Sequence, residues 1–220
     1  MTDLNTTLNR FQPISLDEMD SVRLMNRTDT KFMVGVRELD LVLQGLGDNY
    51  RVLEVLGVRT NLYQTLYFDT PDFRCYRQHH SGKRNRYKIR KREYVESHMS
   101  FLEYKEKTNT GRTVKSRIRL AGIAEEMDES ESAFIDARTH EHQEYEPKIW
   151  NSFSRVTLVD IVAGERLTID TDIAFQMGER SIRLPELVII EVKRDEQSGA
   201  SQVLRQLKHQ LVRPESMSKY

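Results

Sequence analysis

A stretch of alternating basic residues within positions 83–107 limits what this 220-residue chain can fold into more than any other feature. Basic residues occupy every second position of its first half: Arg86, Lys88, Arg90 and Arg92. In an extended strand such residues leave the backbone by one face, about 6.6 Å apart. Neighbouring cations on one face cannot pack on an apolar core, so the stretch predicts a strand that faces an anion or a hydrated cavity.

The same alternation returns in other β-prone segments. Basic residues in these segments are Arg27, Lys31, Lys105, Lys107, Lys115, Arg117, Arg155 and Lys193, and carboxylates at matching positions are Asp170, Asp172 and Glu191. A single basic strand is more often a solvated surface. Recurrence on several strands favours instead one cavity lined by cations, with acids on one side. Such side chains bind phosphate oxygens, and carboxylates among them suit a divalent metal.

The periodicity along the chain predicts an α+β fold with about eight antiparallel strands and few helices, a number at which a closed sheet can hold a ligand inside. Strands are expected at 27–34, 50–58, 64–70, 86–92, 103–107, 112–120, 148–161, 166–175 and 186–193. Helices are expected near 15–20, where Ser15 and Glu18 have capping-box spacing, and at 38–46, 72–80 and 201–211. We expect one domain over 1–220, with an N-terminal scaffold region at 1–26 and an acidic helical surface insertion at 124–146.

Composition excludes several classes of protein. The 34 basic residues equal the 34 acidic ones, and no aromatic stacking platform is evident, which argues against a nucleic-acid binder. Cys75 is the only cysteine, so no intrachain disulfide or cysteine-based metal cluster is possible. Neither common nucleotide-binding glycine motif occurs. Because there is no signal peptide or long apolar run, we expect a cytoplasmic protein without a membrane span.

Eight ordered motifs then carry a family resemblance. They are RTDTKF, YFDTPD, NRYKIRKREY, FLEYKEK, TVKSR, RLTIDTDI, VIIEVK and SKY, between about residue 20 and residue 220. In this order they resemble the catalytic domain of the vacuolar transporter chaperone (VTC) polyphosphate polymerases, in the CYTH or triphosphate tunnel metalloenzyme superfamily. The resemblance implies an eight-stranded antiparallel β tunnel in which basic side chains hold ATP and inorganic polyphosphate.

The resemblance also implies roles for individual residues. Lys31 would lie near the transferred phosphate, and Arg90 and Arg92 would hold the nucleotide phosphates. Lys105 and Lys115 would line the tunnel.

Further roles follow in the same way. Arg155 would clamp a phosphate, Glu191 would bind Mn²⁺ or Mg²⁺, and Lys219 would close the tunnel. By alternation alone, further substrate-binding candidates are Arg27, Arg86, Lys88, Lys107, Arg117 and Lys193, and further metal candidates are Asp170 and Asp172.

This chain departs from the family pattern in three ways. It carries neither the phosphate-sensing SPX domain nor the membrane helices of the eukaryotic enzymes, so any membrane protein would be a separately encoded partner. Arg27 replaces the first glutamate of the ExExK motif of the hydrolytic branch, which weakens a second metal site. Phe153 stands two residues before Arg155, where a tyrosine is expected.

The sequence therefore predicts an ATP-dependent polyphosphate polymerase. Two alternatives stay open: a tripolyphosphatase or nucleoside triphosphatase that gives the γ-phosphate to water, and a non-catalytic polyphosphate-binding module.

Overall fold

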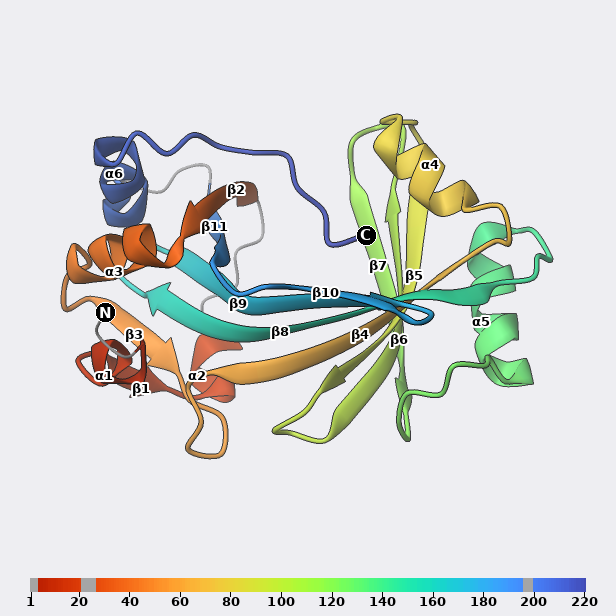
Figure 1. Ribbon diagram of the computed structural model, residues 1–220, viewed down its shortest axis with the longest axis horizontal. Helices are drawn as coiled ribbons and strands as arrows, with labels where there is room; N and C mark the ends of the chain where they lie inside the picture. Colours follow the sequence, from red (N-terminus) through yellow and green to blue (C-terminus); the bar gives the residue numbers. More distant parts are fainter. Residues whose placement is uncertain (1–3, 21–26, 196–199) are drawn as a thin grey trace. The chain divides into compact units, whose positions relative to one another are not determined.

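The computed structural model describes residues 4–20, 27–195 and 200–220, and Figure 1 shows its helices and strands. The helices are α1 (Leu4–Leu8), α2 (Leu16–Asp20), α3 (Val36–Gln44), α4 (Arg74–His80), α5 (Glu129–Thr139) and α6 (Gln202–His209). The strands are β1 (Gln12–Ile14), β2 (Arg27–Gly35), β3 (Tyr50–Leu53), β4 (Asn61–Asp69), β5 (Arg86–Tyr94), β6 (Met99–Lys107), β7 (Thr113–Leu120), β8 (Glu146–Asp160), β9 (Glu165–Met177), β10 (Arg180–Leu184) and β11 (Leu187–Asp195). In these residues no helix is long and apolar enough to span a membrane.

The strands form one sheet whose main path has the order β2-β11-β9-β8-β4-β5-β6-β7. The pairs β11 with β2, β11 with β9, β4 with β5, β5 with β6 and β6 with β7 are all antiparallel. The expected fold class, an antiparallel sheet with few helices, is confirmed. The sheet has eleven strands rather than eight, because β1, β3 and β10 pair at the sides of the main path.

The expected closure of the sheet into a barrel is not found: within the described residues, β2 and β7 do not pair with each other. The segment after α6 pairs with β2 instead. Phe32 forms a bridge with Pro214, and the Glu215 N–H donates to the Lys31 carbonyl at 2.9 Å.

The chain folds into two compact units, each assembled from several segments. The first unit comprises Met1–Leu62, Phe153–Ile173 and Arg183–Ser218, and the second comprises Tyr63–Ser152, Ala174–Ile182 and Lys219–Tyr220. The strands β4, β8 and β9 each contribute residues to both units.

The core of the first unit lies on one face of its strands. Apolar residues at alternate positions of β2, β9 and β11 are buried with residues of α3 and α6: Phe32, Val34, Leu167, Ile169, Ile190 and Val192, with Leu39, Val42, Val203 and Leu207. Since side chains alternate across a strand, Lys31 and Glu191 leave by the opposite face. Burial of the apolar face thus fixes the orientation of the charged one.

The second unit has its own core behind β5 and β6, formed by Leu66, Phe68, Ile89, Leu102 and Tyr104 with Ile135 of α5. The predicted helix is present as α5, and one side of it packs on this core. Its Glu131 is 6% exposed, and its Ile135 is fully buried.

A buried ion pair joins α5 to the back of β5. The Lys91 side chain is 1% exposed, and its Nζ lies 2.9 Å from Glu131 Oε2. It also donates to the carbonyls of Ala124 at 3.0 Å and Glu126 at 2.7 Å. Lys91 therefore points away from the face of Arg90 and Arg92 and is satisfied inside the protein.

Local signals set the ends of several elements as predicted. In the capping box before α2, the Ser15 N–H donates to Glu18 Oε2 at 2.9 Å, and the Glu18 N–H donates to Ser15 Oγ at 3.2 Å. Gly178 has a φ of 57° in the turn between β9 and β10, a conformation that favours glycine.

Candidate functional site

The second unit carries rows of cations across β5, β6 and β7, which lie side by side in Figure 1. The strand register places Lys88 opposite Lys105, and Lys105 opposite Lys115. The next rows are Arg90, Glu103 and Arg117, then Arg92, Phe101 and Arg119. Like charges in directly opposed positions repel one another. We call the basic residues on this side of the three strands the cationic face: Arg86, Lys88, Arg90, Arg92, Lys105, Lys107, Lys115, Arg117 and Arg119.

Exposure changes along the cationic face. Arg92 is 7% exposed, and its Nε donates to Thr65 Oγ1 at 3.1 Å. Arg90 and Lys88 are half-buried, whereas Lys105, Lys107 and Lys115 are exposed. The face therefore has a buried end at Arg92 and an open end at Lys107, and electrostatic interactions are strongest at the buried end.

Glu103 is the carboxylate at the centre of the cationic face. Its Oε2 accepts from Arg90 Nε at 2.6 Å and lies 2.6 Å from Arg90 Nη2, while Arg90 Nη1 donates to the Tyr67 hydroxyl at 3.4 Å. Burial by itself would raise the pKa of Glu103, but the charges of Arg90 and Arg92 outweigh it and lower that pKa. Glu103 is thus ionised at neutral pH and fixes the direction of the Arg90 guanidinium.

Tyr220 is anchored at the same face. Its ring stacks on Tyr67 with centroids 4.7 Å apart, its hydroxyl donates to Asp69 Oδ2, and its main-chain oxygen accepts from Lys88 Nζ at 3.1 Å. Asp69 is fully buried and also accepts from the N–H groups of α4, at 2.8 Å for both Cys75 and Tyr76. These contacts keep residues 219–220, and with them Lys219, in the second unit.

Arg86 differs from the other basic residues of β5. Its Nε donates to His79 Nδ1 at 3.3 Å, and its Nη1 donates to the Lys83 carbonyl at 2.8 Å. Arg86 therefore helps to hold the turn between α4 and β5.

The charged face of the first unit has a different balance, with acids beside its cations. Lys31 on β2 lies opposite Glu191 on β11, and Asp29 lies opposite Lys193. The Lys193 ammonium contacts Glu191 Oε2 and lies 3.5 Å from Asp29 Oδ2. The Lys31 Nζ donates to the Met217 carbonyl at 2.8 Å. We call this the mixed-charge face: Asp29, Lys31, Arg155, Asp170, Glu191 and Lys193.

Arg155 and Asp170 form a bidentate pair on the mixed-charge face. Arg155 Nε donates to Asp170 Oδ1 at 2.5 Å, and Nη2 donates to Oδ2 at 2.7 Å. Asp170 is 2% exposed, and the Arg155 guanidinium lies 5.0 Å from the ring centroid of Phe153. A buried carboxylate bound on both oxygens holds Arg155 firmly in one orientation.

The pKa of Glu191 reflects these surroundings. Burial by itself would raise it, but the positive charges of Lys193, Lys31 and Arg155 lower it below the ordinary glutamate value. Glu191 is therefore ionised at neutral pH.

Comparison with protein families gives a match to the VTC domain over residues 26–220. The chain belongs to the VTC domain family. The resemblance inferred from eight short motifs is thereby confirmed. No match was found among curated proteins.

Solved structures give a likeness in fold for this VTC domain. A Bacillus halodurans protein described as a candidate adenylate cyclase is 15% identical, with 89% of this chain and 96% of that chain covered, at a TM-score of 0.52. A Hippeastrum protein described as a candidate adenylyl cyclase with a dominant triphosphatase activity is 14% identical, with 89% and 93% covered, at a TM-score of 0.46. At such identities the likeness to the first of these shows the fold alone.

The VTC domain residues proposed as metal ligands do not form one cluster. Asp170 is bound by Arg155, and Asp172 is exposed, with a φ of 51°. In the described part of the chain, no three His, Cys, Asp or Glu side chains lie together as metal ligands would. Mg²⁺ is commonly held by one or two carboxylates with substrate phosphates and water. Glu191, ionised and half-buried, fits that kind of site. The roles of Asp170 and Asp172 as metal ligands stay predictions.

Sequence reasoning missed the aromatic residues of the VTC domain that lie beside its cations. Tyr67 contacts Arg90, and Tyr63, Tyr94 and Phe101 lie together next to Arg92. The three residues come from different strands, so only the strand register brings them together. The sequence did contain one usable signal. Tyr94 follows Arg90 and Arg92 at alternate positions of the same strand, so it lies on their face.

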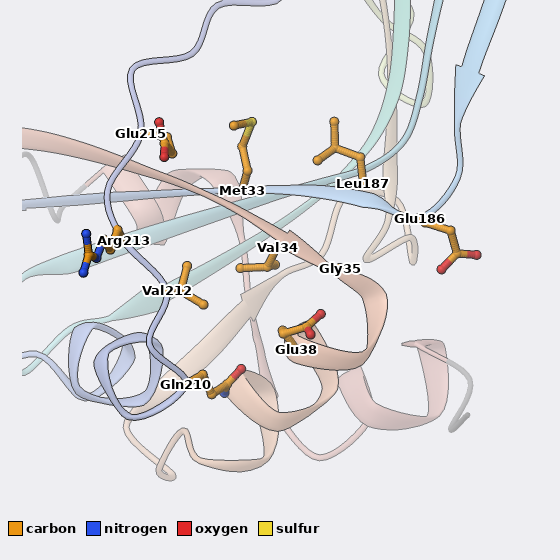
Figure 2. Close-up of a pocket in the computed structure, with 10 residues that line it drawn as sticks. All are labelled: Met33, Val34, Gly35, Glu38, Glu186, Leu187, Gln210, Val212, Arg213 and Glu215. Carbon is orange, nitrogen blue, oxygen red and sulfur yellow. The ribbon is translucent and has the colours of Figure 1, made fainter.

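A separate pocket of about 610 Å³ opens in the first unit, where β2 ends and α3 begins (Figure 2). It is lined by Met33, Val34, Gly35, Glu38, Glu186, Leu187, Gln210, Val212, Arg213 and Glu215. Its carboxylates outnumber its single guanidinium, which disfavours phosphate there. The cationic and mixed-charge faces remain the candidate functional surfaces.

Proposed function

We propose that this VTC domain protein is a phosphotransferase that moves the γ-phosphate of ATP to the end of an inorganic polyphosphate chain. The observation that supports this most is the register of β5, β6 and β7, which aligns Lys88, Lys105 and Lys115 in one row. Three ammonium groups in one row can bind successive phosphates of a polyanion that lies along them.

In this proposal Arg90 and Arg92 bind the nucleotide phosphates at the buried end of the cationic face. The row of Lys88, Lys105 and Lys115 holds the polyphosphate. Within the second unit, further phosphate contacts would come from Lys107, Arg117 and Lys219. On the mixed-charge face of the first unit, Lys31, Arg155 and Lys193 are the proposed phosphate contacts, and the side chain of Arg27, also predicted from the sequence, lies outside the described residues. Arg86 contributes through the turn that it holds.

The reaction needs little covalent help from the protein. A terminal oxygen of the polyphosphate attacks the γ-phosphorus, the bond from that phosphorus to the bridging oxygen of ADP breaks, and ADP leaves with the electron pair. Negative charge spreads over the phosphoryl oxygens in the transition state, so fixed cations and correct alignment supply most of the rate enhancement. Lys31 would act nearest the transferred group, and Glu103 would keep Arg90 aligned.

A divalent cation fits the proposal through Glu191. Mn²⁺ or Mg²⁺ bound by this carboxylate and by phosphate oxygens would offset the charge of the triphosphate. Asp29 reaches the same Lys193 ammonium as Glu191 and would complete the acidic side of the site.

The test is incubation of the protein with ATP and Mn²⁺, followed by gel analysis of chain length. Polyphosphate longer than the triphosphate supports the proposal. Orthophosphate as the sole new product would make the protein a triphosphatase, and polyphosphate binding without ATP turnover would make it a binding module. Either result overturns the proposal. We also propose a cytoplasmic location, with any membrane protein as a separate partner.

A further inference from the structure

Three aromatic rings lie beyond the buried end of the cationic face. Tyr63 on β4 is directly opposite Tyr94 on β5, and Phe101 on β6 is directly opposite Arg92. The ring centroids of Tyr63 and Tyr94 are 5.0 Å apart at 61°, and those of Tyr94 and Phe101 are 6.0 Å apart at 85°. All three residues are half-buried. We call them the aromatic group.

The aromatic group is continuous with the cations. The Arg92 guanidinium lies 5.6 Å from the ring centroid of Tyr63, and the Arg117 guanidinium lies 4.4 Å from that of Phe101. Arg90, Arg92 and Tyr94 follow one another at alternate positions of β5, so each step along the face is about 6.6 Å. The surface thus passes from lysines, through arginines, to aromatic rings.

This order matches the chemistry of a nucleoside triphosphate. Its phosphates need cations, and its base is a flat aromatic ring that stacks on tyrosine or phenylalanine. Inorganic tripolyphosphate and polyphosphate offer nothing to an aromatic ring. Aromatic residues that served only to close the core would lie on the opposite face, where Ile89 and Leu102 are buried.

We propose that Tyr63, Tyr94 and Phe101 form the subsite for the base of a nucleoside triphosphate whose phosphates lie along Arg92 and Arg90. The inference rests on the proposed function for the position of the phosphates. Since every base has a π-face, the subsite selects nucleotides over inorganic phosphate chains, and purines over pyrimidines, without strong preference for adenine.

The direct test is calorimetric titration of ATP and of inorganic tripolyphosphate into the Tyr94→Leu variant. Loss of a stacked ring should weaken ATP binding about five- to a hundredfold and leave tripolyphosphate binding within about twofold. Tyr94→Phe is the matched control, because it keeps the ring and should keep the ATP affinity. Retained tripolyphosphate binding also shows that the variant is folded. If both ligands weaken equally, or ATP binding is unchanged, the base subsite is ruled out.

A second measurement needs no variant. The wild-type protein should bind ATP and GTP at least about fivefold more tightly than ribose 5-triphosphate, which lacks a base, with UTP and CTP between. Equal affinities would overturn the inference.

The two proposals fail separately. If the wild-type protein makes no polymer but Tyr94→Leu loses ATP affinity selectively, the base subsite stands and the polymerase assignment falls. If polymer forms but the ratio of ATP to tripolyphosphate affinity is the same in Tyr94→Leu as in the wild type, only the base subsite falls.

Discussion

The two units both present a charged sheet face, but they place their acids differently. On the mixed-charge face of the first unit, Asp170 binds Arg155, and Glu191 contacts Lys193. On the cationic face of the second unit, Glu103 is the acid among several basic residues, and a further carboxylate, Glu131, lies behind the sheet with Lys91. The first face, which also includes Arg166 opposite Lys193, has nearly as many acids as cations, whereas basic residues far outnumber acids on the second.

This difference suggests a division of roles. A face with excess positive charge gains most from a polyanion and would supply affinity. A balanced face holds its cations in fixed directions and can offer a carboxylate to a metal ion, so it would contribute to the chemical step more than to affinity. The predictions below separate these roles.

The largest expected effect is a loss of folding stability when the buried Lys91–Glu131 ion pair behind the cationic face is broken. Lys91→Met leaves Glu131 buried without its ammonium partner, and breaking such a pair costs about 3–5 kcal/mol. Urea unfolding should show this loss. The double variant Lys91→Met/Glu131→Leu is the control and should recover much of it, because neither charge remains buried. A loss below about 1 kcal/mol in the single variant would mean that the pair does not hold α5 to the sheet.

The second effect is on turnover. Arg90→Ala removes the central guanidinium of the cationic face and should lower the rate of polymer formation about 10²- to 10³-fold, as loss of one transition-state donor does. The matched control is Arg84→Ala, since Arg84 is exposed in the turn before β5. Rates are compared at saturating ATP and Mn²⁺. Equal rates in the two variants would contradict a role for the cationic face in the reaction.

The third effect tests the acids of the mixed-charge face. Glu191→Gln keeps the shape of the side chain but removes its charge, so the Mn²⁺ concentration for half-maximal activity should rise at least about tenfold. Asp172→Asn serves as the control and should have the wild-type Mn²⁺ dependence, because Asp172 is exposed. The reverse outcome, with Asp172 sensitive and Glu191 insensitive, would move the metal site away from β11.

The features of the fold that depend on the alternation of residues along a strand were predictable from the sequence. The alternate positions of Arg86, Lys88, Arg90 and Arg92 were enough to place these four basic residues on one face, because a strand has only two faces. Most strands and helices followed from the same rule and from local caps. The short β1 and β10 were missed, since a strand of three to five residues gives too few repeats to recognise.

What depends on register or on long-range contacts was not predictable. The rows of the cationic face, and the meeting of Tyr63 with Tyr94, exist only once the strands are paired. The pairing of both Asp170 oxygens with Arg155, fifteen positions away, was likewise not evident from the sequence. Nor does any local pattern indicate that Lys91 pairs with Glu131 of α5.

The smallest expected effect is the most direct test of the charge difference between the faces. Glu103→Gln removes the carboxylate at the centre of the cationic face, so tripolyphosphate affinity should rise about two- to tenfold. Glu106→Gln, one strand position from an exposed lysine but on the opposite face of β6, is the control and should leave the affinity unchanged. An affinity that falls in Glu103→Gln would mean that alignment of Arg90 matters more than net charge.

The same variant gives a prediction for pH. The folded-state pKa of Glu103 is below the ordinary glutamate value of 4.5, so its ionised form stabilises the folded protein above that pH. This contribution is lost as pH falls from about 4.5 through the lower folded pKa. In urea unfolding at a series of pH values, Glu103→Gln should therefore lose less stability on acidification than the wild-type protein. If both lose the same amount, Arg90 and Arg92 do not lower the pKa of Glu103 in the folded protein.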